Sequence, residues 1–108
     1  MTLLAHMHAE KAAHREHLRL AVRARLRAAL GELLPGEACW VYGSLTRAGG
    51  YRDTSDVDLA LECEPVDRSL YSLGSLFEEK IGRPVDLVLL GETRLAEKIR
   101  REGERWIA

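Results

Sequence analysis

Asparagine and glutamine are missing from the 108-residue chain altogether, and aromatic residues make up only 6% of it. Proteins of thermophiles often avoid heat-labile amides. A GC-rich genome would give the same bias, so the growth temperature of the source stays open. The scarcity of aromatic side chains leaves no segment on which single-stranded nucleic acid would stack. Direct binding to nucleic acid is therefore not expected.

Long apolar runs are also lacking. No segment reaches the roughly 20 apolar residues of a membrane-spanning helix. The amino terminus has Leu3-Leu4 but neither the basic flank nor the apolar core of a signal peptide. We therefore expect a cytoplasmic protein without a membrane partner. The two cysteines, Cys39 and Cys63, are too few for a disulfide framework, and we expect both to be buried, inert thiols.

The remaining composition is typical of a small globular protein. Hydrophobic residues account for 46% of the chain and charged residues for 31%, and the length is near the commonest domain size. We expect one domain over 1–108, made of an N-terminal helix over 1–34, a core over 38–90, and a C-terminal helix and tail over 91–108.

The first segment is basic and has helical periodicity. Residues 1–30 hold six basic and two acidic side chains, whereas residues 31–80 hold ten acidic and four basic ones. Apolar residues recur at a spacing of three to four, as on one face of a helix: Leu18, Val22, Leu26, Ala29, Leu30 and Leu33. Gly31 and then Pro35-Gly36 are expected to end this helix.

Four arginines of this helix are spaced by four residues and form a strip: Arg15, Arg19, Arg23 and Arg27. Like charges at this spacing repel slightly, by a few tenths of a kcal/mol for each pair. The strip is either a solvated face or a docking surface for an acidic partner, and a protein partner fits better than RNA.

Strands and helices alternate in the rest of the chain. Apolar runs bounded by glycine or proline predict three strands, over 38–42, 57–62 and 85–90. Helical spacing predicts a helix over about 70–81, capped by Asp67 or Ser69 and closed by Gly82, and another from Thr93 to about Arg101. Residues 105–108 are a weaker fourth strand. This order predicts an α/β (α+β) fold, with a small mixed sheet of three to four strands flanked by helices.

The least ordinary stretch lies between the first two strands. The first strand runs into Gly43-Ser44, a polar loop follows, and the second strand opens on Asp56 and Asp58. Because strand side chains alternate between faces, these carboxylates point the same way and would repel each other. A hard cation such as Mg²⁺ would remove the repulsion, and free N–H groups in a Gly-Ser turn suit a phosphate.

Asp86 is a third acid of interest. It is the only charge in the strand at 85–90, where a carboxylate needs a cation or a basic partner. If this strand lies beside the second one, Asp86 joins Asp56 and Asp58 in one cluster. A salt bridge to Arg83 or to another basic side chain is the competing interpretation.

These residues resemble the minimal nucleotidyltransferases of the DNA polymerase beta-like superfamily, which are commonly antitoxins paired with HEPN-domain toxins. The resemblance rests on Gly43-Ser44, on Arg47 and the glycines after it, on the run Ser55-Asp56-Val57-Asp58-Leu59, and on Asp86. It covers roughly residues 38–90, and its combination of Gly-Ser with Asp-x-Asp is fairly specific.

Two features of the loop depart from the family pattern. Eleven residues separate Ser44 from Asp56, one more than is usual, and Ala48 stands where a glycine commonly follows the arginine. An added loop residue costs little free energy. It would, however, shift Ser44 relative to the carboxylates.

The resemblance implies a role for each matched residue. Asp56, Asp58 and Asp86 would hold one or two Mg²⁺ ions, and Asp86 would also help to deprotonate the acceptor hydroxyl. Five residues would bind the phosphates of a nucleoside triphosphate such as ATP: Gly43, Ser44, Arg47, Arg52 and Ser55. Taken alone, Arg47 and Arg52 are equally well explained as solvated loop charges.

Two functions stay open from the sequence. One is a Mg²⁺-dependent nucleotidyltransferase that transfers a nucleotide, AMP from ATP in the first instance, to a protein hydroxyl of a HEPN-type ribonuclease toxin. The other is an antitoxin that neutralises its toxin by contact and has a weak or vestigial nucleotidyltransferase site. The intact acids favour the first function, whereas the altered loop spacing and small size permit the second.

Overall fold

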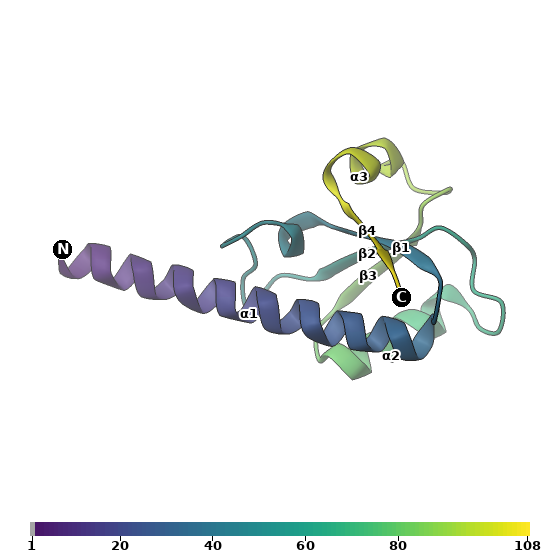
Figure 1. Ribbon diagram of the computed structural model, residues 1–108, viewed down its shortest axis with the longest axis horizontal. Coiled ribbons are helices and arrows are strands. Elements are labelled where there is room, and N and C mark those ends of the chain that lie inside the picture. The colour runs from purple at the N-terminus through teal and green to yellow at the C-terminus, as the bar shows by residue number, and fades with distance from the viewer. Residues whose placement is uncertain (1) are drawn as a thin grey trace.

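The computed structural model describes residues 2–108. The elements follow in the order α1 (Leu3–Leu33), β1 (Ala38–Tyr42), a 3₁₀ turn η1 (Gly43–Thr46), β2 (Val57–Leu61), α2 (Leu70–Ile81), β3 (Val85–Leu89), α3 (Ala96–Glu102) and β4 (Glu104–Ile107). The molecule measures 55 × 28 × 20 Å, because the first half of α1 extends beyond the body that the other elements form (Figure 1).

The four strands form one mixed sheet in the order β3-β2-β1-β4. β1 runs antiparallel to both β2 and β4, and β2 runs parallel to β3. The sheet, with its fourth strand and three helices, confirms the expected α+β architecture and is consistent with a nucleotidyltransferase-like fold.

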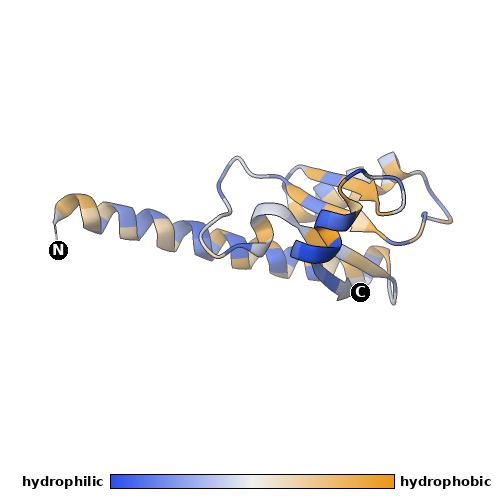
Figure 2. Ribbon diagram, turned by 90° about the horizontal axis from the view of Figure 1, so that it is seen from above, coloured by the Kyte–Doolittle hydropathy of each residue, from blue (hydrophilic) through white to orange (hydrophobic). Residues whose placement is uncertain are grey.

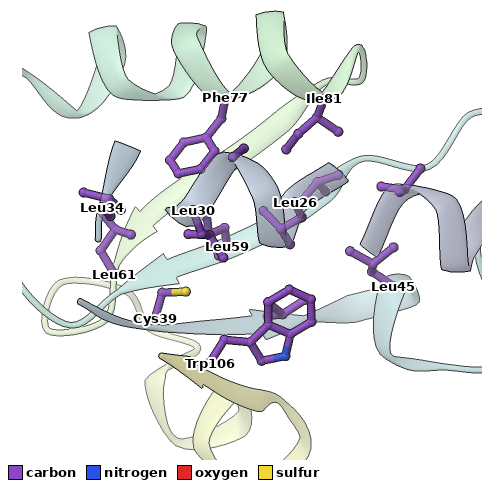
Figure 3. Close-up of a cluster of buried hydrophobic side chains, with 14 of the residues drawn as sticks. Leu26, Leu30, Leu34, Cys39, Leu45, Leu59, Leu61, Phe77, Ile81 and Trp106 are labelled. Carbon is purple, nitrogen blue, oxygen red and sulfur yellow. The ribbon is translucent and has the colours of Figure 1, made fainter. Parts of the chain in front are cut away.

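α1 and α2 cover one face of the sheet and enclose the main core. Leu26 and Leu30 of α1 and Phe77 and Ile81 of α2 lie over Leu59 of β2, and all five side chains are at most 1% exposed (Figure 3). Complete burial of such a side chain contributes about 1.5–3 kcal/mol. This layer therefore supplies most of the stability of the fold.

α3 covers the opposite face over a smaller cluster. Ile99 of α3 packs against Ala60 and Leu90, with Tyr42 at the margin. Side chains alternate along a strand, so the residues of β2 and β3 that lie between two core-facing residues point to the α3 side of the sheet. Asp58 and Asp86 consequently belong to the set of strand residues on the α3 side of the sheet.

α1 is longer than its apolar stripe. It runs through Gly31 and ends at Leu33, so Gly31 does not stop the helix as expected. A helical glycine costs about 1 kcal/mol, and burial of the flanking Leu30 and Leu34 outweighs that cost. Polar and apolar residues mix along the extended half of α1 (Figure 2), and no helix within residues 2–108 is long and apolar enough to cross a membrane.

The other helix ends follow from local capping. The hydroxyl of Ser69 accepts a hydrogen bond from the Ser72 N–H at 3.0 Å, so Ser69 and not Asp67 caps α2. Gly82 closes α2 at φ +76°, as expected. α3 begins later than expected, at Ala96, because residues 93–95 form a turn before it.

The two cysteines have different surroundings. Cys39 lies in the core, and burial raises the pKa of its thiol to about 11. Cys63 is exposed, because β2 already ends at Leu61 and Cys63 falls in the bend that follows. The expectation of two buried thiols is therefore wrong for Cys63.

Candidate functional site

The turn after β1 is built around Gly43. This residue adopts φ +75°, a left-handed conformation that side chains disfavour. A Cβ atom at Gly43 would also come within 2.3 Å of Asp58 Oδ2. Gly43 and Ser44 open the 3₁₀ turn, where backbone N–H groups have no partner inside the turn. The turn thus sets free N–H groups close to the carboxylate of Asp58.

β2 and β3 bring two of the three acids side by side. Asp58 and Asp86 are register partners in this parallel pair, and neighbouring strands lie about 4.8 Å apart. Asp58 is half-buried, and burial, followed by the charges of Asp86 and Asp56, raises its pKa to about 6. Asp56 and Asp86 are exposed. β3 therefore lies beside β2 as expected, and the acids repel one another.

The three acids are not arranged as a complete set of metal ligands. In the part of the chain that the structure describes, no three His, Cys, Asp or Glu side chains are grouped so that they could hold a metal ion. The assignment of Asp56, Asp58 and Asp86 as metal ligands remains a prediction.

Arg83, the competing partner of Asp86, is engaged elsewhere. Its guanidinium donates to the hydroxyl of Tyr51 at 3.2 Å and lies over the ring of the same residue. It also donates to three carbonyl oxygens of the loop between η1 and β2, residues 47–56, which we call the motif loop: those of Arg52, Asp53 and Ser55. None of the ion pairs found within residues 2–108 involves Asp86. The salt-bridge interpretation of Asp86 is therefore wrong, and Arg83 braces the loop.

A cavity of about 230 Å³ lies between the 3₁₀ turn, Asp58 and α3. It brings together three of the residues predicted from the sequence: Gly43, Arg47 and Asp58. The other lining residues were not anticipated: Tyr42, Thr46, Leu95, Lys98, Ile99 and Glu102. Burial, and then the charges of Asp58 and Asp86, raise the pKa of Tyr42 to about 12, so its phenol stays protonated at neutral pH.

The remaining predicted residues lie outside this cavity. Arg52 is exposed and lines a different cavity, of about 570 Å³, between the motif loop and α1. The hydroxyl of Ser55 accepts a hydrogen bond from the Arg52 N–H at 3.0 Å, which closes a turn in the loop. Ser44 is half-buried beside Gly43, and Asp86 lines a groove between α2 and β3.

α1 holds the motif loop against the body. Arg19 Nη1 donates to the carbonyl oxygen of Leu45 at 3.0 Å, and Arg23 Nη1 donates to the same oxygen at 3.3 Å. Glu16 Oε1 accepts from the Gly49 N–H at 2.9 Å. The Arg19 guanidinium binds both oxygens of Glu16 at 2.8 Å and, with Gly49, lowers the pKa of Glu16 to about 2. The 3₁₀ turn and the loop that follows it are thus fixed from outside the sheet.

Most of the arginine strip is used inside the molecule. Besides Arg19, Arg23 forms an ion pair with Glu104, and the guanidinium of Arg27 lies 4.2 Å from the centroid of the Trp106 ring. Arg19 and Arg23 are half-buried and are therefore not part of a solvated face, whereas Arg27 is exposed. The docking surface stays a prediction. The helical spacing of the arginines could not predict these contacts within the molecule, because the contacts depend on where α1 crosses the loop and β4.

Comparison with known proteins gives one informative result. No protein-family model matches the chain, and no curated protein matches it. Among solved structures, it is similar to a chain from a crystal structure of a toxin–antitoxin with AMP-PNP, with 20% sequence identity and a TM-score of 0.62. The match covers 79% of this chain and 73% of the other. The TM-score shows that the two proteins share a fold, and at 20% identity the likeness shows nothing beyond the fold.

Proposed function

We propose that this chain is a Mg²⁺-dependent nucleotidyltransferase that transfers a nucleotide, AMP from ATP, to a protein hydroxyl. In this proposal it is an antitoxin, and the acceptor is its HEPN-type ribonuclease toxin. The proposal depends on one arrangement: Asp58 is the register partner of Asp86, and the carboxylate of Asp58 lies against the backbone of Gly43. The fold shared with a toxin–antitoxin protein solved with a nucleotide analogue supports it.

The acids suit a divalent cation by their chemistry. Carboxylate oxygens are the ligands that Mg²⁺ prefers. Burial, and then the charges of Asp86 and Asp56, raise the pKa of Asp58, so a cation beside it would stabilise its anionic form. Asp56, Asp58 and Asp86 would hold the ion. When bound, it supplies positive charge that offsets both the carboxylates and the phosphates of the substrate.

The protein itself binds and orients the triphosphate. The N–H groups of Gly43 and Ser44 would donate to phosphate oxygens, and Arg47 and Lys98 line the cavity from opposite sides with positive charge. The hydroxyl of Thr46 donates a hydrogen bond to the carbonyl oxygen of Gly43 at 2.7 Å, which makes the turn more rigid.

The acceptor reaction follows from the exposure of Asp86. A hydroxyl beside Asp86 would lose its proton to that carboxylate while its oxygen forms a bond to the α-phosphorus. The bond from the α-phosphorus to the pyrophosphate breaks, and pyrophosphate leaves. Because Asp86 lies on an exposed edge strand, a hydroxyl of a macromolecule can reach it.

Co-expression with the protein encoded next door tests the proposal. The purified pair is incubated with Mg²⁺ and labelled ATP, and intact masses are measured for the wild type, for Asp58→Asn and for the control Asp67→Asn. We expect nucleotide additions to the partner with the wild type and Asp67→Asn but none with Asp58→Asn. A complex without any mass increase would favour an antitoxin that acts by contact alone. Neither complex nor mass increase would overturn both functions.

A further inference from the structure

β3 is an edge strand with unused backbone groups. It pairs with β2 on one side only. The carbonyl oxygen of Pro84 accepts from the Val57 N–H at 2.9 Å, which fixes the side on which each residue of β3 bonds. In a parallel strand this side alternates from residue to residue. The N–H and C=O groups that point away from the sheet therefore belong to Val85, Leu87 and Leu89. The Leu89 carbonyl oxygen accepts from the N–H groups of Glu92 and Thr93 at 3.0 and 3.2 Å, which leaves the three N–H groups and the carbonyl oxygens of Val85 and Leu87 for a further strand.

This edge is apolar, and it is open from Val85 to Leu87, whereas the turn after β3 bonds to the outward carbonyl oxygen of Leu89. None of the five residues of β3 is fully buried, whereas four of the five in β2 are. Natural sheets usually block such an edge with lysine, proline or a bulge. β4, the other edge, carries Glu104 and Arg105, but Asp86 is the only charge on β3. The sequence thus leaves β3 free to accept another strand.

A groove runs beside this edge and provides room for side chains. Its volume is about 420 Å³, and it lies between β3 and the exposed side of α2. Gly74 and Ser75 are small residues that line the α2 side of the groove, which leaves it wide. Tyr71, which is 85% exposed, lies at its edge. Both charged residues that line it, Glu78 and Asp86, are acidic, and neither takes part in an ion pair found within residues 2–108. A basic occupant would complement this charge.

The register determines where the side chains of an added strand would go. A strand paired outside β3 would lie about 4.8 Å from it and send alternate side chains to opposite faces. On the α3 face, the side chain level with Asp86 would lie about 5 Å from the Asp86 Cβ. On the other face, its neighbours would enter the groove along α2.

We propose that the β3 edge and this groove form the docking site for the acceptor, as an extended, basic segment that carries a hydroxyl side chain. The segment pairs with β3 through backbone hydrogen bonds, which provide affinity, and places its hydroxyl beside Asp86. The role of the hydroxyl rests on the proposed function, but the pairing does not.

A peptide experiment on the full chain tests the docking site. The probe is a short synthetic peptide in which valine alternates with lysine around one tyrosine, and a twin carries glutamate in place of lysine. Amide hydrogen exchange of Val85, Leu87 and Leu89 is followed by NMR. We expect the lysine peptide to slow exchange at these three amides by roughly tenfold and the glutamate peptide to have no effect.

A matched pair of variants locates the charge contact. Glu78 lines the groove, and Glu79, its exposed neighbour on α2, does not. We expect Glu78→Gln to weaken binding of the lysine peptide by about two- to fivefold, as a surface ion pair would, and Glu79→Gln to leave it unchanged. Ser75→Arg, at an exposed position of the groove wall, should abolish binding.

Each other outcome is decisive. No protection by the peptide, or equal protection by its glutamate twin, would overturn the proposal. Protection that grows with protein concentration without peptide would show that β3 pairs with a second copy, and would overturn it too. Peptide binding without nucleotide transfer in the presence of Mg²⁺ and ATP would support the docking site and count against the proposed function.

Discussion

The carboxylate of Asp58 lies against the backbone of Gly43, so close that a Cβ atom at Gly43 would sit 2.3 Å from Oδ2. One residue comes from the turn after β1 and the other from the start of β2. The turn that would bind phosphate and the acid that would bind metal therefore fit together as one unit, and a change in either should disturb both.

Gly43→Ala tests this contact, with Gly49→Ala as its control. Both glycines have φ near +75°, but a Cβ at Gly49 would meet nothing within 4 Å. We expect Gly49→Ala to lower the free energy of unfolding by about 1–2 kcal/mol through backbone strain alone. Gly43→Ala should cost roughly 1–3 kcal/mol more because of the clash and should abolish binding of Mg²⁺–ATP. Equal costs in urea unfolding would show that the contact is unimportant.

The raised pKa of Asp58 predicts how stability depends on pH. Since the pKa is about 6 in the fold and 3.8 ordinarily, the folded state holds the proton more tightly than the unfolded state. The stability linked to this proton is present below about pH 4 and is lost as the pH rises through 6. The side chain is half exposed, so the effect should be modest.

Asp58→Asn should remove this dependence. In chelator, we expect the variant to melt at a higher temperature than the wild type at pH 7.5 and at a similar temperature at pH 4. Mg²⁺ should raise the melting temperature of the wild type only. Parallel pH profiles for the two proteins would contradict the assigned pKa.

The strands could be predicted from the sequence because their signals are local. Glycine and proline bound the apolar runs, so β1 agrees at both ends and β2 and β3 agree within one residue. The lone charge in an apolar strand singled out Asp86, because a carboxylate there needs a cation or a polar partner. Its pairing with Asp58 followed only on the condition that the two strands are neighbours, and the structure meets that condition.

The contacts between layers could not be predicted. Lys98 reaches the cavity because of the way α3 crosses the sheet, and Arg19 reaches Leu45 because of the way α1 crosses the loop. No pattern along the chain specifies either crossing. Nor did any pattern place Arg52 beside α1, where it lines the cavity of about 570 Å³; its role in phosphate binding stays a prediction.

Lys98 should contribute to binding of the triphosphate. It lines the cavity with Asp58 and Arg47, is exposed, and takes part in no ion pair found within residues 2–108. Lys98→Met should therefore leave stability unchanged and weaken Mg²⁺–ATP binding about tenfold, equivalent to about 1.4 kcal/mol. Adenosine binding should not change. Lys80→Met, which removes a surface partner of Glu32, is the control; an equal loss of affinity in both variants would exclude a direct role.

Arg19 should preorganise the turn that we propose to bind phosphate, and Arg25 offers a matched comparison on the same helix. Each arginine donates to a backbone carbonyl, Arg19 to Leu45 in the turn and Arg25 to Ile81 at the end of α2. Both Arg→Met variants should lose about 1–3 kcal/mol of stability, as expected for a charged hydrogen bond. Only Arg19→Met should also weaken Mg²⁺–ATP binding, by roughly fivefold (about 1 kcal/mol).

The effect of Arg19 on stability can be separated from its effect on Mg²⁺–ATP binding. Arg19→Lys keeps the charge but cannot bind both Glu16 oxygens and the Leu45 carbonyl together, because an ammonium lacks the planar fork of a guanidinium. Its affinity for Mg²⁺–ATP should therefore fall between those of the wild type and Arg19→Met, even where its melting temperature matches the wild type. If affinity instead followed melting temperature across all three variants, Arg19 would stabilise the fold without shaping the site.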